Sequence, residues 1–306
     1  MPTRAALQRI LPRRGVAVSR ETPGTWRRAG AAMASEPMLA SGLLLLLLVG
    51  LFAMLGPLVI NTELAQIGAA PPRQRPGAEH WLGTDVQGRD IFAALVLATP
   101  QTLKIGLFAG VMGLGLGCIL GLLAGYFGGW TDTVVRTLAD VVMTIPGIAV
   151  LVLVATNVRS MTVALMAVIV AGLAWMYPTR TIRAQTLSMR ERPYVDIARL
   201  NGMGGLQLVF TEIFPNLLPY IAASFVTAVS SAMLATIGLE ALGLGPQNEF
   251  TLGMMIFWAQ YYGAILRNLW WWWLPPVAMM ALIFIALLLT STGMDRLVNR
   301  RLRVEA

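Results

Sequence analysis

Six long apolar runs constrain this chain more than any other feature of its sequence. Most of them reach the roughly 20 residues that a helix needs to cross a bilayer core of about 30 Å. They cover about residues 38–60, 102–126, 134–157, 161–179, 213–238 and 271–294. Inside lipid every backbone N–H and C=O group must be satisfied within the chain, so runs of this length predict helices. The expected fold is an all-α polytopic membrane protein with six transmembrane helices.

The composition excludes several other classes of protein. Only 12% of the residues are charged, about half the share of a typical soluble domain. Cys118 is the single cysteine and His80 the single histidine, which leaves no intrachain disulfide, no cysteine metal site and no multi-histidine site. The single lysine, Lys104, lies in "QTLKIGLF" and not in a phosphate-binding G-x-x-x-x-G-K-[ST] loop. The net charge of +8 comes from arginines scattered among apolar spans, which favours membrane orientation over nucleic-acid binding.

The distribution of arginine predicts the side on which each connecting segment lies. Seventeen of the 23 basic residues fall in the N-terminal tail, at Arg136, in the loop after the fourth span and at the C-terminus. By the positive-inside rule, both termini and residues 180–212 are cytoplasmic, and residues 61–101 and 239–270 lie outside. No signal-cleavage site follows the first apolar run, so we expect that run to be retained as an anchor.

One cytoplasmic stretch, "YVDIARLNGMGGLQLVFTEIFP" at residues 194–215, is far less apolar than the runs on either side. Pro193 suits the first turn of a helix and Gly202 suits its end, which predicts a short helix of about nine residues. Helical spacing places Tyr194, Ile197, Ala198 and Asn201 on one face. Two interpretations remain: an amphipathic helix that lies on the headgroups, or a plug that fits the groove of a partner.

The same stretch resembles a known signature. Asp196 and Ala198, followed by Gly202 four residues later and by Pro215 thirteen residues after that, resemble the cytoplasmic EAA signature of permease subunits of ATP-binding-cassette (ABC) importers. Asp196 and Ile197 stand where that family usually has Glu and Ala. In the family the helix before the glycine is a coupling helix that sits in a cleft of the ATPase subunit. The resemblance therefore implies an ATPase-coupling role for Tyr194, Asp196, Ile197, Ala198, Asn201, Gly202 and Pro215.

The resemblance extends over residues 38 to about 303. "HWLGTDVQGRDIF" and "RTLADVVMTIPG" are similar to the second permease subunit of dipeptide and oligopeptide importers. The first of these stretches carries the family motif LGTDxxGRD on the extracytoplasmic segment, with His80, Gly83, Thr84, Asp85, Gly88, Arg89 and Asp90. The chain is then expected to comprise a basic cytoplasmic tail (1–37), a first transmembrane helix (38–60), an extracytoplasmic segment (61–101) and a permease core (102–303) with five further transmembrane helices and the coupling loop 180–212.

The resemblance implies the type I importer permease fold and a transport subunit that is not itself an enzyme. Its expected partners are a homologous second permease subunit, two ABC ATPase subunits that bind ATP and Mg²⁺, and an extracytoplasmic binding protein. The resemblance also implies that this chain binds no cofactor of its own and resides in a bacterial or archaeal cell membrane. Peptides are the first expected cargo, and an oligosaccharide, nickel or another small solute is the alternative. An intramembrane enzyme or a secondary transporter lacks support, because the sequence has no HExxH motif and no repeated intramembrane ionisable residues.

Polar groups within spans are costly, so Asp140 and Glu240 are candidate residues of the translocation path. Pro146 is a third candidate. Asp140 lies one turn after Arg136, and a local ion pair is the favoured alternative. Pro146 is expected to kink its helix. Glu240 either lies at the entrance of the path or is a solvated helix end, and the second interpretation is favoured.

Two compositional features allow further predictions. The four tryptophans at 270–273 are expected to form an interfacial aromatic belt, with stacking on a sugar cargo as the alternative. The glycines between residues 110 and 125 are expected to allow close helix packing against a sister subunit. They are Gly110, Gly113, Gly115, Gly117, Gly121 and Gly125.

Overall fold

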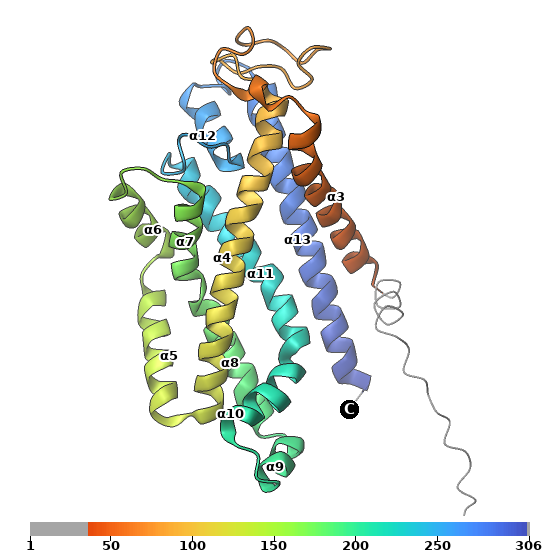
Figure 1. The fold of residues 1–306 in the computed structure, drawn as a ribbon, viewed down its shortest axis with the longest axis vertical. Coiled ribbons are helices and arrows are strands. Elements are labelled where there is room, and N and C mark those ends of the chain that lie inside the picture. Colours follow the sequence, from red (N-terminus) through yellow and green to blue (C-terminus); the bar gives the residue numbers. More distant parts are fainter. Residues whose placement is uncertain (1–35, 305–306) are drawn as a thin grey trace, which may run out of the picture. The chain divides into compact units, whose positions relative to one another are not determined.

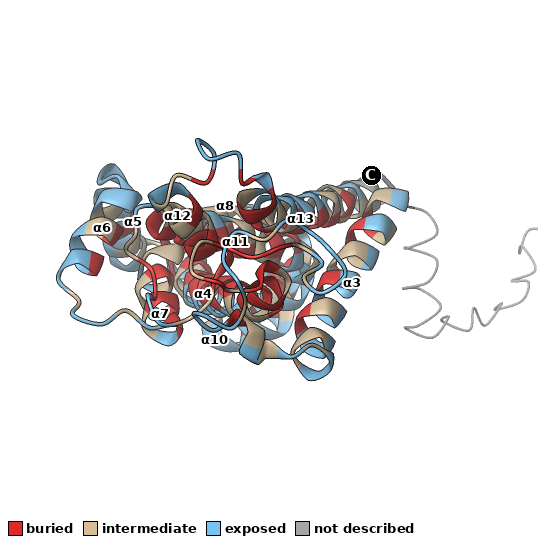
Figure 2. Cartoon of the chain, turned by 90° about the horizontal axis from the view of Figure 1, so that it is seen from above, coloured by how far each residue is buried: buried red, intermediate tan, exposed pale blue. Residues whose placement is uncertain are grey.

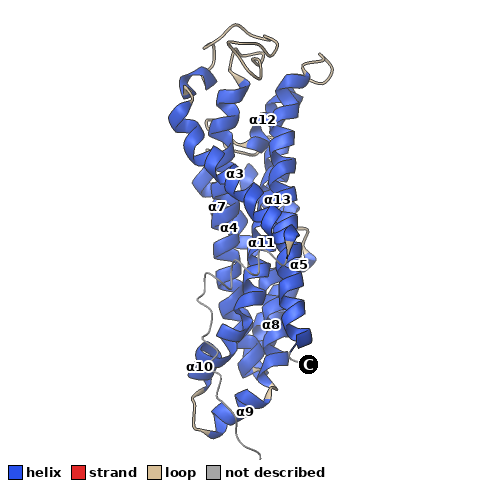
Figure 3. Cartoon of the chain, turned by 90° about the vertical axis from the view of Figure 1, so that its right-hand side faces the viewer, coloured by secondary structure: helices blue, strands red, loops and turns tan. Residues whose placement is uncertain are grey.

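The structure, a computed structural model, describes residues 36–304, with side chains described to residue 297. Of the predicted basic tail, only the last two residues fall inside this range. Figure 1 shows the arrangement of the helices, and Figure 3 shows the described chain as helices joined by loops. The described part contains no named strand, and the only β-type pairing is an isolated bridge between Thr84 and Asp90. The all-α prediction is therefore confirmed for residues 36–304.

The helical elements follow one another with short connections, except for the segment after η1. In chain order they are α3 (Pro37–Val59), η1 (Thr62–Ala65), α4 (Ile91–Phe127), α5 (Gly129–Thr144), α6 (Gly147–Thr156), α7 (Val163–Ala174), α8 (Met176–Arg190), α9 (Pro193–Leu200), α10 (Gly205–Leu208), the π-turn η2 (Val209–Ile213), α11 (Phe214–Ala241), α12 (Leu252–Tyr261) and α13 (Trp270–Val304).

By length and composition, five helical segments of the described chain can span a membrane, or six if α5 and α6 together form one span. Five helical segments of the described chain are long and apolar enough to span on their own, namely α3, α4, α7 with α8, α10 to α11, and α13. The pair α5 and α6 passes the same criteria but bends by 76° at the break. Helix α4 ends at the lower end of the bundle, and α5 and α6 lie one above the other between that end and α7 (Figure 1). The break falls at Ile145 and Pro146, which confirms the predicted kink.

The helices extend beyond the apolar runs that predicted them. Helix α4 begins at Ile91 instead of near residue 102, so the last part of the predicted extracytoplasmic segment 61–101 is helical. Helix α8 continues to Arg190, and the helical segment that contains α11 begins at Gly205. The predicted loop 180–212 is therefore loop only in part. Hydropathy detects the part of a helix that lipid covers, whereas hydrogen bonding continues the helix until a cap ends it.

Helix α4 is the central element. It packs against α3, α5, α7, α8 and α11, and buried residues gather along it in Figure 2. Glycines every four residues on its C-terminal half face α7 and α8 and allow their backbones to approach. A Cβ atom at Gly117 would lie 2.9 Å from the Thr179 nitrogen, and one at Gly121 would lie 2.8 Å from the Thr179 carbonyl oxygen.

The prediction that these glycines pack against a sister subunit is wrong for five of the six. Gly110 meets Val229 of α11, Gly113 meets Ala174, and Gly125 meets Thr186 of α8. Gly117 and Gly121 meet α8 as described above. Only Gly115 has no atom within 4 Å of the position that a Cβ would occupy. The sequence could indicate close packing but not which helix supplies the other surface.

An ion pair joins the start of α5 to α8. The Arg183 guanidinium donates from Nε to Oδ1 of Asp132 and from Nη2 to Oδ2 of Asp132, the second bond spanning 2.6 Å, and the two side chains are 20% and 21% exposed. The pair predicted between Arg136 and Asp140 is also present, at 3.4 Å, but its side chains are 64% and 45% exposed. The first pair is bidentate and shielded, and it fixes α5 on α8.

Double-mutant cycles will separate these two pairs. We expect a coupling free energy of about 1 to 3 kcal/mol between Asp132→Ala and Arg183→Ala, because a shielded bidentate pair is lost. The matched control, Arg136→Ala with Asp140→Ala, is expected to give about 0.5 kcal/mol or less. Unfolding of the detergent-solubilised protein measures both, and equal couplings would contradict the assignment.

Candidate functional site

The short helix α9 lies outside the membrane-spanning segments and is eight residues long, close to the predicted nine. Pro193 occupies its first turn, as predicted. At its end the Gly202 N–H donates to the Arg199 carbonyl over 3.0 Å, and the Met203 N–H donates to the Ala198 carbonyl over 3.2 Å. This pattern is a Schellman cap, which requires a positive φ at Gly202, and φ there is +81°.

One face of α9 is fixed to the rest of the protein. Val195 and Ala198 are buried. They belong to a cluster that includes Leu122 of α4, Ile182 of α8 and Leu208 of α10. Because the cluster joins α9 to the longer helices α4 and α8 and to α10, a force on α9 is transmitted to those helices and not absorbed by a flexible loop.

The other face of α9 presents apolar side chains that the described chain does not cover. Ile197 is 60% exposed and Leu200 is 88% exposed. The predicted single face is therefore divided: Ile197 and Asn201 point outward, Ala198 points inward, and Tyr194 is half-buried. Val195 and Leu200 were not predicted. Two apolar pairs at a spacing of three, Val195 with Ala198 and Ile197 with Leu200, are the signal that would have identified both stripes.

Pro215 lies in the first turn of α11, as predicted. The helical segment nevertheless begins earlier, at Gly205. Pro215 has no N–H to donate to the Thr211 carbonyl. A π-turn precedes it, closed by the Phe214 N–H bonding to the Val209 carbonyl. The Asn216 side chain donates to the Glu212 carbonyl over 2.7 Å. The break in α-helical register is thus stabilised locally, next to the α9 cluster.

At the end of the bundle opposite α9, the LGTDxxGRD motif forms a loop before α4 (Figure 1). Several hydrogen bonds hold this loop in place. Asp90 is the N-cap of α4, and its Oδ1 accepts from the Ala93 N–H over 2.8 Å. Its Oδ2 lies 2.7 Å from Nδ1 of His80. Thr84 Oγ1 donates to the Pro71 carbonyl and accepts from the Gln74 N–H. These bonds tie the start and the end of the segment together.

Asp85 organises the turn inside the motif. Its Oδ1 accepts from the N–H of Gln87 over 2.7 Å and of Arg89 over 2.9 Å. Burial raises the pKa of Asp85 above its ordinary value, whereas these N–H donors and the charge of Arg89 act in the opposite direction. Gly83 has φ +73°, and a Cβ there would lie 2.5 Å from the Gln74 carbonyl oxygen. The motif residues therefore have structural roles in this loop that explain their spacing.

The tryptophan run belongs partly to the core. Trp271 and Trp272 are buried, and only Trp270 is strongly exposed, so the interfacial-belt prediction is wrong for two of the four residues. Trp271 Nε1 donates to the Thr84 carbonyl over 3.3 Å. Trp272 stacks on Tyr262 with ring centroids 6.0 Å apart. The physical reason is that the loop before α4 and the segment around α12 cover the first turn of α13.

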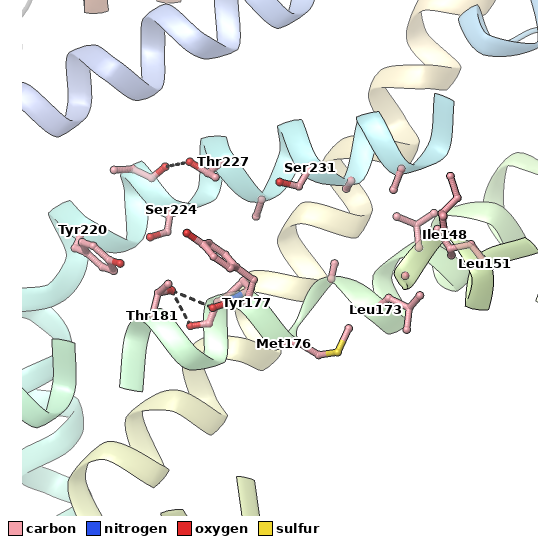
Figure 4. Close-up of a pocket in the computed structure, with 18 of the residues that line it drawn as sticks. Ile148, Leu151, Leu173, Met176, Tyr177, Thr181, Tyr220, Ser224, Thr227 and Ser231 are labelled. Carbon is pink, nitrogen blue, oxygen red and sulfur yellow. Dashed lines mark hydrogen bonds between the residues drawn. The ribbon is translucent and has the colours of Figure 1, made fainter. Parts of the chain in front are cut away.

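A groove opens between α6, α7, α8 and α11 (Figure 4). It has a volume of about 410 Å³. Helix α11 contributes hydroxyl groups along one face, four, three and four residues apart, and α8 contributes two more; these residues are Tyr220, Ser224, Thr227, Ser231, Tyr177 and Thr181. Among the described lining residues Asp295 is the only charged one. Such a surface can exchange hydrogen bonds with a polar solute while carrying a single charged side chain.

The structure does not bring the three predicted path residues together. Pro146 directly precedes Gly147 and Ile148, which line the groove. Asp140 lines a separate pocket of about 210 Å³ with Arg136 and two arginines of α8. Glu240 lines neither pocket, and its path role stays a prediction.

Glu240 corrects one further expectation. It is 0% exposed, so the solvated-helix-end interpretation is wrong. The chain folds back after α11, and Gly253 of α12 packs directly on the Glu240 side chain. Both carboxylate oxygens lack a hydrogen-bond partner within the described residues.

Comparison with known proteins places these features in a family. Residues 117–304 match the family described as "Binding-protein-dependent transport system inner membrane component", a range that includes α9 and the groove. The chain is 30% identical over 185 residues to the oligopeptide transport system permease protein of Mycobacterium tuberculosis (strain ATCC 25618 / H37Rv), covering 60% of this chain and 64% of that protein. It thus spans somewhat less than two thirds of that relative's length.

Two further relatives are matched over more of their length. The dipeptide transport system permease protein of Alkalihalophilus pseudofirmus is 32% identical over 223 residues, which cover 72% of this chain and 73% of the relative. The oligopeptide transport system permease protein of Bacillus subtilis (strain 168) is 27% identical over 229 residues, 74% of each chain. This multi-pass chain belongs to the family of binding-protein-dependent transport system inner membrane components.

Proposed function

We propose that this chain is the permease subunit of an ATP-driven ABC importer and forms half of the translocation path for peptides delivered by an extracytoplasmic binding protein. The observation that carries the proposal is α9, a short helix outside the spans with one face anchored and one apolar face uncovered. Family membership supports the dependence on a binding protein.

In this proposal the outer face of α9 fits a cleft in an ABC ATPase subunit. Ile197 and Leu200 supply the apolar contact, and Asp196 and Arg199 form an exposed pair beside it. Two ATPase subunits bind ATP and Mg²⁺, and this chain binds neither. Closure of the ATPases moves α9, and the buried Val195 and Ala198 transmit that movement to the helices around them.

The groove is this chain's half of the path, and a homologous second permease subunit completes it. Its walls include α8 and α11, which flank α9 in sequence, so movement of α9 acts on the groove. Peptides are the proposed cargo because the relatives above are named for oligopeptide and dipeptide transport. The oligosaccharide alternative relied on an aromatic stacking surface, and the burial of Trp271 and Trp272 removes half of that surface.

The proposed orientation rests on the charge distribution, and the arrangement of the helices supports it. The positive-inside rule places residues 180–212 and both termini in the cytoplasm. Helix α9 and the described end of α13 lie at one end of the bundle, and the LGTDxxGRD loop lies at the other (Figure 1). The loop then faces the binding protein, and α9 faces the ATPases.

Thiol labelling tests the groove as a path. Ser231 lies exposed on the groove face of α11, and Leu234, three residues later, is 64% exposed and does not line the groove. In the complex reconstituted into proteoliposomes, we expect a thiol reagent to reduce peptide uptake by the Ser231→Cys variant about 10-fold, because the adduct fills the groove. The Leu234→Cys variant should keep its uptake. Equal inhibition of the two variants, or of neither, would contradict the proposed path.

A further inference from the structure

A second pocket lies at the end of the bundle that carries the LGTDxxGRD loop. Its volume is about 450 Å³. Its walls come from the residues after η1, the motif, the connection after α11, α12 and the start of α13. The lining residues that matter below are Asp85, Arg89, Glu249, Phe250, Trp258 and Trp272.

Arg89 brings unused hydrogen-bonding capacity to this pocket. Its Nε is buried and has no hydrogen-bond partner within the described chain. The guanidinium lies 5.5 Å from the centroid of the Phe250 ring, a cation–π contact that holds it in place. The Arg89 side chain is half-buried, and a guanidinium whose N–H groups lack acceptors favours a ligand that supplies one.

Each acidic residue of the pocket uses one carboxylate oxygen to accept from the backbone. Oδ1 of Asp85 accepts two backbone N–H groups of the motif. Oε1 of Glu249 accepts the Val163 N–H over 3.1 Å. Neither carboxylate lies within 4.0 Å of a nitrogen of the Arg89 side chain. Arg89 therefore has no ion-pair partner among the described residues, and a carboxylate of a ligand matches the planar fork of a guanidinium.

We propose that this pocket binds the C-terminal carboxylate of the peptide cargo at the extracytoplasmic mouth of the path, with Arg89 as the residue that recognises it. The proposal rests on the proposed function. Phe250, Trp258 and Trp272 line the same pocket, so an apolar side chain of the terminal residue has a surface to pack on. The pocket volume of about 450 Å³ is larger than a single carboxylate group would fill, such as one from a docked protein partner.

The role of the Arg89 side chain can be tested without dismantling the motif. The Arg89 contribution to the turn is made by its backbone, since its N–H bonds to Asp85 Oδ1 and its carbonyl accepts from the Asp85 N–H. An Arg89→Met variant keeps both bonds. Arg75→Met is the matched control, because Arg75 lies exposed on the same segment and does not line the pocket.

The experiment compares one peptide as the free acid and as the C-terminal amide, with the same binding protein throughout. ATP-driven uptake into proteoliposomes is measured for the wild-type complex and for both variants. We expect Arg89→Met to lower uptake of the free acid about 10-fold and to leave the amide unchanged, because a charge-assisted contact is lost only for the acid. Arg75→Met should leave both unchanged. Direct calorimetric binding of the two peptides to the solubilised complex, without ATP, should show the same loss for the acid alone.

Two results would overturn the proposal. The first is an equal loss for acid and amide, which would make Arg89 a structural residue. The second is an intact acid-to-amide ratio with a weakened Kd of the binding protein for the complex, which would assign the carboxylate to that protein. Failure of the proposed function is distinct from both, because the wild-type complex would then take up neither peptide, while calorimetry would still report whether Arg89 selects the acid.

Discussion

Replacing Gly121 by leucine is expected to destabilise the fold strongly. A Cβ at this position would lie 2.8 Å from the Thr179 carbonyl oxygen and 3.0 Å from the Arg183 nitrogen, both backbone atoms of α8. Backbone atoms of a packed helix cannot move aside as a side chain can, so α4 and α8 must separate. We expect a loss of about 3 kcal/mol in the free energy of unfolding, at the upper end of the usual cost of overpacking. Thermal unfolding and the yield of monodisperse protein in detergent measure the effect.

The same helix provides the control. Gly115 lies on α4 with nothing within 4 Å of its Cβ position and is exposed. A leucine there meets no backbone and gains about 0.8 kcal/mol of helix propensity, so Gly115→Leu should fold as well as the wild type. If both variants unfold alike, or Gly121→Leu is as stable as Gly115→Leu, then α4 does not pack on α8 as described.

Replacing Gly202 by valine is expected to leave the protein inserted in the membrane and to uncouple ATP hydrolysis from uptake. No atom lies within 4 Å of the Cβ position, so the cost comes from the backbone, whose φ of +81° a β-branched residue strongly disfavours. Loss of this conformation removes the Schellman cap of α9 and changes the path of the chain between α9 and α10. We expect peptide uptake to fall at least about 10-fold. ATP hydrolysis should continue, at a rate no more than a few-fold above its basal value.

Gly204→Val isolates the contribution of backbone conformation. Gly204 also has nothing within 4 Å of its Cβ position, but its φ is −66°, which valine adopts without strain. This variant should transport at the wild-type rate. Normal transport by Gly202→Val, or equal losses in the two variants, would remove α9 from the coupling role.

The sequence was a sufficient guide wherever a single local rule decides the structure. Apolar length predicted the crossings, Pro146 predicted the break between α5 and α6, and Pro193 with Gly202 predicted the limits of α9. Each of these depends on the chain's own backbone chemistry: lipid leaves the backbone no partner but itself, proline lacks an N–H, and glycine accepts positive φ.

The sequence was a poor guide wherever a distant segment decides. Glu240 reads as the end of a span, and only the return of α12 over it makes it buried. Trp271 and Trp272 read as interfacial, and only the Thr84 loop and Tyr262 make them core residues. The glycines of α4 indicate close packing, but the identity of the opposing helix depends on the tertiary fold. The Arg89 pocket likewise joins segments from both halves of the chain.

Coupling of importer ATPases to a peptide delivered from outside is the central property that we assign to this chain. The most direct measurement is ATP hydrolysis by the chain assembled in proteoliposomes with a second permease, two ATPase subunits and a binding protein. We predict that the peptide-loaded binding protein stimulates hydrolysis several-fold, that the empty one does not, and that an oligosaccharide cannot replace the peptide. Failure of the chain to associate with any ABC ATPase, or hydrolysis indifferent to the loaded binding protein, would contradict this assignment.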